Sequence, residues 1–113
     1  MEALVDVRPS SWSLVDGAGS APAIECGPMR VGLSPALHFG LRALIAAAGA
    51  RARVPELQDF VEPTALVEPA SGVEPHAVVR GLRAAFCALG LADMVIAHER
   101  FGYRLRYPAG PRH

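Results

Sequence analysis

Two segments of the chain each begin at a proline, end before a glycine and repeat apolar residues at helical spacing. The first starts at Ser34-Pro35 and reaches Gly49, and the second starts at Pro75 and reaches Gly90. Serine or proline at the start and glycine just past the end are common boundaries of a helix. The sequence therefore predicts helices over residues 35–48 and 75–89, each with one apolar face to bury.

Short apolar segments separated by turn signals precede the first helix. Residues 12–15, 23–26 and 29–31 are divided by Asp16-Gly17 and by Gly27-Pro28. Apolar runs of this length, bounded by glycine and proline, are typical of antiparallel strands. We expect three N-terminal strands, with Trp12 as a core anchor between them and the helices.

The end of the chain predicts a hairpin. Its strands are expected over residues 94–97 and 103–107, with the turn within residues 98–102. Because side chains alternate along a strand, Tyr103, Leu105 and Tyr107 should share one face, and Arg104 and Arg106 the other.

The segment between the two long helices contains a repeat. Val-Glu-Pro occurs three times at intervals of six residues, beginning at Val61, Val67 and Val73. Each proline disfavours helical geometry at the glutamate before it, so residues 62–74 predict an extended, exposed acidic loop. Before this loop, a short second helix is expected from residues 54–55, with an apolar stripe formed by Leu57, Phe60 and Val61.

Charge is divided unevenly along the chain, although the formal net charge is zero. Residues 1–75 carry five arginines against nine acidic residues, and residues 76–113 carry six arginines against two. All eleven basic residues are arginine, whose planar guanidinium suits phosphates and base edges. A GC-rich genome also produces an arginine-rich, alanine-rich composition, so the uneven distribution is the more informative observation.

The length and composition indicate one globular domain. A chain of 113 residues, 51% of them hydrophobic, is enough for one core and too short for two. We expect the domain over residues 12–107, an N-terminal arm over residues 1–11 and a frayed tail over residues 108–113. Arginines interrupt the longest apolar stretch, and the acidic start lacks the layout of a secretory signal, so no membrane contact and a cytoplasmic location are expected.

Neither a cofactor nor catalysis is expected from the residue pattern. Cys26 and Cys87 stand alone, without histidines at ligand spacing, which predicts two reduced thiols and no metal site. The chain has no nucleophile–base spacing, no glycine-rich phosphate loop and no paired carboxylates in an expected cleft. We therefore expect a binding protein rather than an enzyme.

Three motifs occur in the order found in one known family. The segment Leu33-Ser-Pro-Ala-Leu-His-Phe-Gly-Leu-Arg-Ala-Leu44 resembles the Leu-Thr-Pro-Thr-Glu-Phe opening of the first helix in OmpR-like response-regulator effector domains. Arg80-Gly-Leu-Arg83 resembles the Ser-Arg-Leu-Arg of their recognition helix, and Glu99-Arg-Phe-Gly-Tyr-Arg-Leu105 resembles their wing signature, Arg-Gly-x-Gly-Tyr-Arg-Leu. The resemblance, over residues 12–107, implies an α+β winged helix-turn-helix with N-terminal antiparallel strands, three helices and a C-terminal hairpin wing.

The chain departs from this family at several positions. We expect no receiver domain of the kind that normally precedes such effectors, because 113 residues leave no room for one. Leu37 stands where the first helix usually has glutamate, Ala84-Ala85 replaces the Arg-Lys that often follows Leu-Arg, and Arg100 replaces the first glycine of the wing. These departures keep a second interpretation open, in which the fold serves protein or peptide binding without sequence-specific DNA binding.

The resemblance implies a small stand-alone bacterial transcription regulator that binds double-stranded DNA, with a homodimer on DNA as a further expectation. A helix fits the major groove, where arginine pairs with guanine O6 and N7, so Arg80 and Arg83 are expected to reach bases or phosphates. Gly102 is expected to supply the backbone freedom of the wing turn. The candidate DNA-binding residues are His76, Arg80, Arg83, Ala84, Arg100, Gly102, Arg104 and Arg106. A solvated helix face is the alternative for the pair Arg80 and Arg83.

The acidic loop has its own expected role. In the family, the loop between the second and third helices can touch RNA polymerase, so Glu62, Glu68 and Glu74 are candidate polymerase or partner contacts. Negative charge is repelled by phosphates, so this loop should point away from DNA. A merely solvated linker is the alternative.

Overall fold

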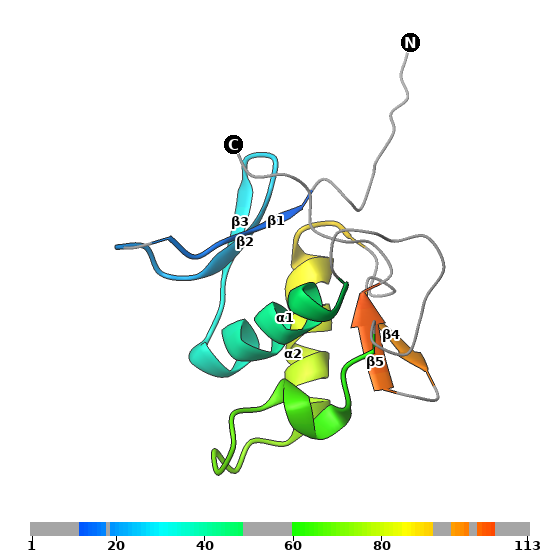
Figure 1. Cartoon of the computed structure of the whole chain (residues 1–113). Coiled ribbons are helices and arrows are strands. Elements are labelled where there is room, and N and C mark those ends of the chain that lie inside the picture. Colours follow the sequence, from blue (N-terminus) through cyan, green and yellow to red (C-terminus); the bar gives the residue numbers. More distant parts are fainter. Residues whose placement is uncertain (1–11, 18, 49–59, 92–95, 100–101, 106–113) are drawn as a thin grey trace.

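The computed structural model describes residues 12–17, 19–48, 60–91, 96–99 and 102–105. Within these residues the chain forms a three-stranded antiparallel sheet, two α-helices, a short 3₁₀ helix and a pair of antiparallel strands. In Figure 1 the sheet and the strand pair lie on either side of the two helices. The architecture is a mixed α+β fold, as expected from the sequence.

The N-terminal sheet confirms the three predicted strands. Its order is β1 (Ser13–Val15), β2 (Ala23–Cys26) and β3 (Met29–Gly32). Leu14 pairs with Ile24, and Ile24 pairs with Val31, so these apolar side chains share one face of the sheet. Leu14 and Ile24 are buried and belong to the core, together with Trp12.

Helix α1 (Pro35–Ala48) has the predicted bounds. The Leu37 amide donates a hydrogen bond to the Ser34 hydroxyl oxygen at 3.3 Å, as expected of a capping serine. Leu41 and Leu44 are fully buried. His38 and Arg42, one turn apart on α1, both bond to Asp16 Oδ2, at 2.9 and 3.3 Å, which ties the end of β1 to the helix.

Helix α2 (Pro75–Ala88) ends one residue earlier than predicted. Gly90 adopts a φ of 82°, and its amide donates to the Cys87 carbonyl. The Leu91 amide donates to the Phe86 carbonyl at 2.9 Å. These two bonds form the glycine-terminated motif that commonly closes a helix, and Leu91 itself is buried.

The two helices and the sheet share one core. Val78, Val79, Leu82 and Phe86 form the buried stripe of α2, as the periodicity predicts. Phe86 meets Trp12 edge to face, with ring centroids 4.9 Å apart. The sheet, α1, α2 and the strand pair all contribute to this cluster.

The segment between the helices differs from its prediction. Residues 54–59 of the expected second helix lie outside the described residues, but Val61 is not helical: it forms an antiparallel bridge with Tyr103. The acidic loop is neither wholly extended nor wholly exposed, because Pro63–Leu66 forms a 3₁₀ helix and Leu66 is fully buried. The described residues contain two α-helices, and the expected start of the third lies outside them.

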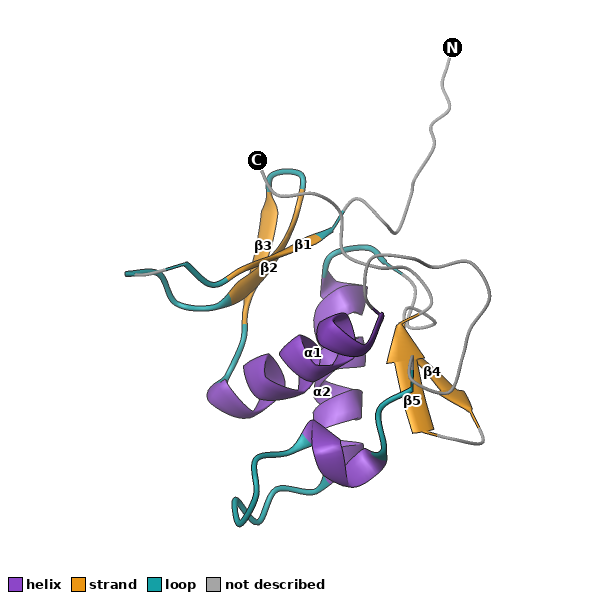
Figure 2. Ribbon diagram, viewed as in Figure 1, coloured by secondary structure: helices purple, strands orange, loops and turns teal. Residues whose placement is uncertain are grey.

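The strand pair, β4 (Ile96–Glu99) and β5 (Gly102–Leu105), follows α2 in the sequence. Its second strand, β5, contacts α1 (Figure 2). His98 pairs with Tyr103 and Glu99 pairs with Gly102, so both ends of the predicted turn region belong to strands. Tyr103 and Leu105 are buried and share a face, as predicted. Tyr107 and Arg106 lie outside the described residues.

Candidate nucleic-acid interface

Helix α2 presents an exposed face opposite its buried stripe. Arg80 is exposed, and its neighbours one turn away on the same face, Ala77 and Ala84, are exposed as well. Their methyl groups leave the Arg80 guanidinium unobstructed by larger side chains on that face. A rigid helix that carries an arginine between small residues can approach a nucleic-acid surface closely.

His76 is exposed at the start of this face, but its surroundings are not typical of a phosphate site. The Ala77 and Val78 amides both donate to the Glu74 carbonyl, at 3.0 and 3.3 Å. These backbone donors are therefore engaged in the first turn of the helix. The Glu74 side chain, two residues before His76, is exposed and adds negative charge at this end.

Arg83 does not join Arg80 on the exposed face. It is half-buried, and its Nη2 donates a hydrogen bond of 2.8 Å to the Ile96 carbonyl oxygen of β4. Its Nε is buried as well. Arg83 was expected to reach bases or phosphates, but in the structure this contact makes it a link between α2 and the strand pair.

We expect Arg83→Met to lower the free energy of unfolding by about 1–2 kcal/mol, because methionine keeps much of the apolar stem but leaves the Ile96 carbonyl without its donor. Arg80→Met on the same helix is the matched control and should change stability by less than about 0.5 kcal/mol. Urea unfolding of both variants measures the difference. Equal stabilities would show that the Arg83 bond does not contribute to the fold.

Arg104 lies on the strand pair, on the face opposite Tyr103. Its side chain is half-buried, and its guanidinium carbon lies 5.7 Å from the centroid of the Phe60 ring. At this distance the positive guanidinium is attracted to the electron-rich face of the aromatic ring, which is a cation–π interaction. Arg104 therefore packs against the segment that precedes the 3₁₀ helix.

Gly102 is buried, so its part in any interface is indirect. It begins β5 with a φ of 135°, a conformation that side chains disfavour. A Cβ at this position would overlap the Val61 carbonyl oxygen. The glycine is needed where the strand pair meets Val61, and it lies in a strand rather than in the turn.

The structure thus divides the eight predicted DNA-binding residues into three groups. His76, Arg80 and Ala84 are exposed on α2, whereas Arg83, Gly102 and Arg104 contribute to internal packing. Arg100 and Arg106 lie outside the described residues. The proposed contact surface on the described residues therefore centres on Arg80.

The three candidate partner contacts, Glu62, Glu68 and Glu74, are all exposed. The valine that precedes each of them is buried or half-buried, since Val61 bridges Tyr103, and Val67 and Val73 pack against the core. The repeat therefore alternates an inward valine with an outward glutamate. It produces an acidic surface held close to the core.

Two features of the described residues were missed by the sequence analysis. One is the Asp16 cluster, for which the four-residue spacing of His38 and Arg42 on α1 was an available signal. The other is Phe39, which α1 leaves 37% exposed. Phe39 lies two residues from both Leu37 and Leu41, so helical spacing places it away from the buried stripe and was an available signal of this exposure.

The described part of the chain contains no group of three or more histidine, cysteine, aspartate or glutamate side chains that could hold a metal ion. None of its helices is both long enough and apolar enough to cross a membrane.

Comparisons of the chain with protein-family models, with curated proteins and with solved structures found no match.

Proposed function

We propose that this protein binds double-stranded DNA through the exposed face of α2, with Arg80 as the main base or phosphate contact. The observation that carries the proposal is the exposure of Arg80 between Ala77 and Ala84, on a helix whose opposite face is locked into the core. Arginine at such a position can pair with guanine in the major groove. The strand pair β4–β5 would then act as the wing of a winged helix-turn-helix.

The wider proposal follows the resemblance to OmpR-like effector domains. The chain would act as a small transcription regulator in the cytoplasm, associated with the nucleoid, and could bind its site as a homodimer. The acidic surface of Glu62, Glu68 and Glu74 would face away from the phosphates, toward solvent or RNA polymerase. All three glutamates are exposed and so are accessible to a partner.

Arg80→Ala is expected to reduce discrimination at one base position by about 1–2 kcal/mol, roughly tenfold in relative affinity. Selection of bound duplexes from a random library, followed by titration of the selected and mismatched sequences, measures this change. Arg42→Ala is the matched control, because it removes the same charge from the exposed surface of α1. Unchanged sequence preference in Arg80→Ala would exclude α2 as the reading helix.

A second candidate function is protein or peptide binding without sequence-specific DNA binding. The observation that favours it is the engagement of Arg83 and Arg104 in internal contacts, which leaves fewer arginines for phosphates than the sequence suggested. The two candidates differ in their dependence on salt and on Arg80. The first candidate requires a duplex affinity that falls as salt rises and a sequence preference that depends on Arg80, and the absence of any duplex affinity would favour the second candidate.

A further inference from the structure

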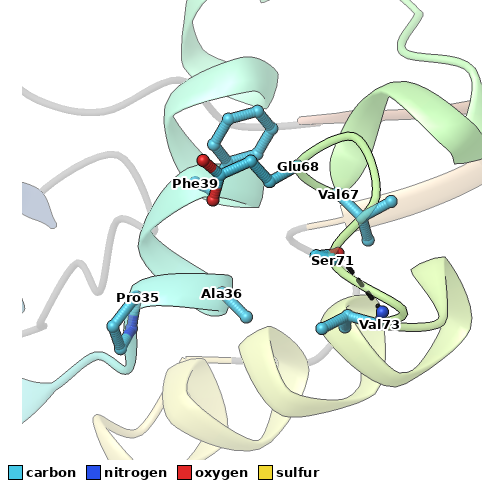
Figure 3. Close-up of a pocket in the computed structure, with 7 residues that line it drawn as sticks. All are labelled: Pro35, Ala36, Phe39, Val67, Glu68, Ser71 and Val73. Carbon is cyan, nitrogen blue, oxygen red and sulfur yellow. Dashed lines mark hydrogen bonds between the residues drawn. The ribbon is translucent and has the colours of Figure 1, made fainter.

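A pocket of about 210 Å³ lies between the first turns of α1 and residues 67–73 (Figure 3). Helix α1 contributes Pro35, Ala36 and Phe39 to its wall, and the other segment contributes Val67, Glu68, Ser71 and Val73. Most of this lining is apolar. The pocket is on no surface proposed above to meet DNA.

The wall formed by residues 67–73 is held in place by its own bonds. The Ser71 amide donates to the Glu68 carbonyl at 3.1 Å, and the Val73 amide donates to the Ser71 hydroxyl oxygen at 3.2 Å. Leu66, just before this segment, is fully buried in the core. The pocket is therefore formed in the folded chain and does not require a partner to create it.

The size of the pocket restricts what it can hold. Sites for drug-sized ligands usually measure about 300–1,000 Å³, so this pocket is suited to a single large side chain. Phe39, which lines the pocket, is 37% exposed and is one of the two large hydrophobic side chains that are exposed in the described residues. An apolar side chain placed there would cover surface that is otherwise in contact with water.

The charge around the pocket indicates the chemistry of the partner. Glu68 lines the pocket, and Glu62 and Glu74 are exposed in the chain on either side of residues 67–73. No lysine or arginine occurs between Arg53 and Arg80. An apolar cavity beside acidic side chains is complementary to an apolar side chain flanked by basic residues.

We propose that this pocket binds one large aliphatic or aromatic side chain from a basic segment of a partner protein. The site adjoins the acidic surface for which a polymerase contact was proposed above, but its occupation does not require DNA binding. Loss of Arg80 leaves it intact, and a blocked pocket leaves Arg80 exposed. The two proposals can therefore fail independently.

The test uses the full chain and synthetic peptides in which a central leucine is flanked by two arginines on each side. Amide chemical shifts of the ¹⁵N-labelled protein are followed during titration. We expect shifts concentrated at Ala36, Phe39, Ser71 and Val73, with a dissociation constant in roughly the 0.1–1 mM range expected of a single weak anchor. A peptide with serine in place of leucine, and one with glutamates in place of the arginines, should each bind at least about fivefold more weakly, which corresponds to about 1 kcal/mol.

Two protein variants separate the pocket from its charge. Ala36→Trp should fill the pocket and abolish binding, whereas Glu68→Arg should weaken binding about tenfold by reversing the nearby charge. Glu25→Arg, on β2, makes the same charge change away from the pocket and should bind as the parent does. Thermal unfolding shows whether each variant is folded. If Ala36→Trp does not fold, Glu68→Arg still tests the proposal.

Three outcomes would overturn the proposal. The first is an absence of shifts at the pocket up to about 1 mM peptide, where even a weak site should be half occupied. The second is equal binding of the leucine and serine peptides. The third is a set of pocket shifts that depends on protein concentration without peptide, which would assign the site to a second copy of this chain.

Discussion

Gly102→Val is expected to lower the free energy of unfolding by about 3 kcal/mol or more, a large share of the stability of a domain of this size. The backbone at residue 102 has a φ of 135°, which a β-branched side chain disfavours strongly. A Cβ there would also overlap the Val61 carbonyl oxygen and lie 2.9 Å from its carbonyl carbon. Neither neighbour is the end of a flexible side chain.

The surrounding hydrogen bonds prevent an inexpensive adjustment at this position. The Val61 amide donates to the Tyr103 carbonyl at 2.7 Å, and the Tyr103 amide donates back to the Val61 carbonyl at 3.0 Å. Movement of Val61 away from a new side chain would break this pair. We therefore expect the strand pair to lose its attachment to the segment that leads into the 3₁₀ helix.

Gly32→Val is the matched control for Gly102→Val. Gly32 is also a strand residue, but a Cβ there would meet no atom within 4 Å, and its φ is not positive. Valine at that position should change stability by less than about 1 kcal/mol. Urea unfolding followed by circular dichroism compares the two variants, and a Gly102→Val variant as stable as Gly32→Val would contradict the described packing.

Gly40→Ala is expected to lower the free energy of unfolding by about 2 kcal/mol, even though alanine is the better helix former by about 1 kcal/mol. A Cβ at Gly40 would lie 2.5 Å from Val78 Cγ1 and 3.1 Å from the Leu66 carbonyl oxygen. Helices α1 and α2 are thus in contact where α1 has no side chain. Gly81→Ala is the control, because the three atoms nearest its new Cβ all belong to the side chain of Leu37, whose methyl groups can move.

A double-mutant cycle identifies the contact responsible. Val78 is buried, so Val78→Ala alone should cost about 2 kcal/mol through the cavity that it leaves. In the double variant the Gly40→Ala methyl occupies part of that cavity. The combined cost should therefore fall short of the sum by at least about 1 kcal/mol, and simple additivity in urea unfolding would show that the helices do not meet there.

The helices and the N-terminal strands were predictable because their signals are local. Ser34 and Pro35 define the start of α1, Gly90 follows the end of α2, and glycine or proline separates the strands. Such signals act through backbone geometry within a few residues. They need no knowledge of what packs against each element.

The contacts that differ from prediction join distant parts of the chain. Val61 has the same apolar character in a helix as in a bridge, and only its pairing with Tyr103 decides between them. Helical spacing places Arg83 near Arg80, but the carbonyl of Ile96 determines where the Arg83 side chain ends. The pocket beside Phe39 likewise depends on how residues 67–73 lie against α1. Single-sequence periodicity contains none of this information.

The salt dependence of duplex binding tests the central proposal most directly. Labelled random and genomic duplexes are titrated with the protein at several salt concentrations between roughly 50 and 200 mM. With Arg83 and Arg104 engaged in the fold, we expect two to three phosphate contacts per protomer from Arg80, Arg100 and Arg106. The slope of log affinity against log salt should then be about −1.8 to −2.7, at about −0.9 per contact. No measurable affinity for any duplex at the lowest salt would contradict DNA binding and leave protein binding as the function of this fold.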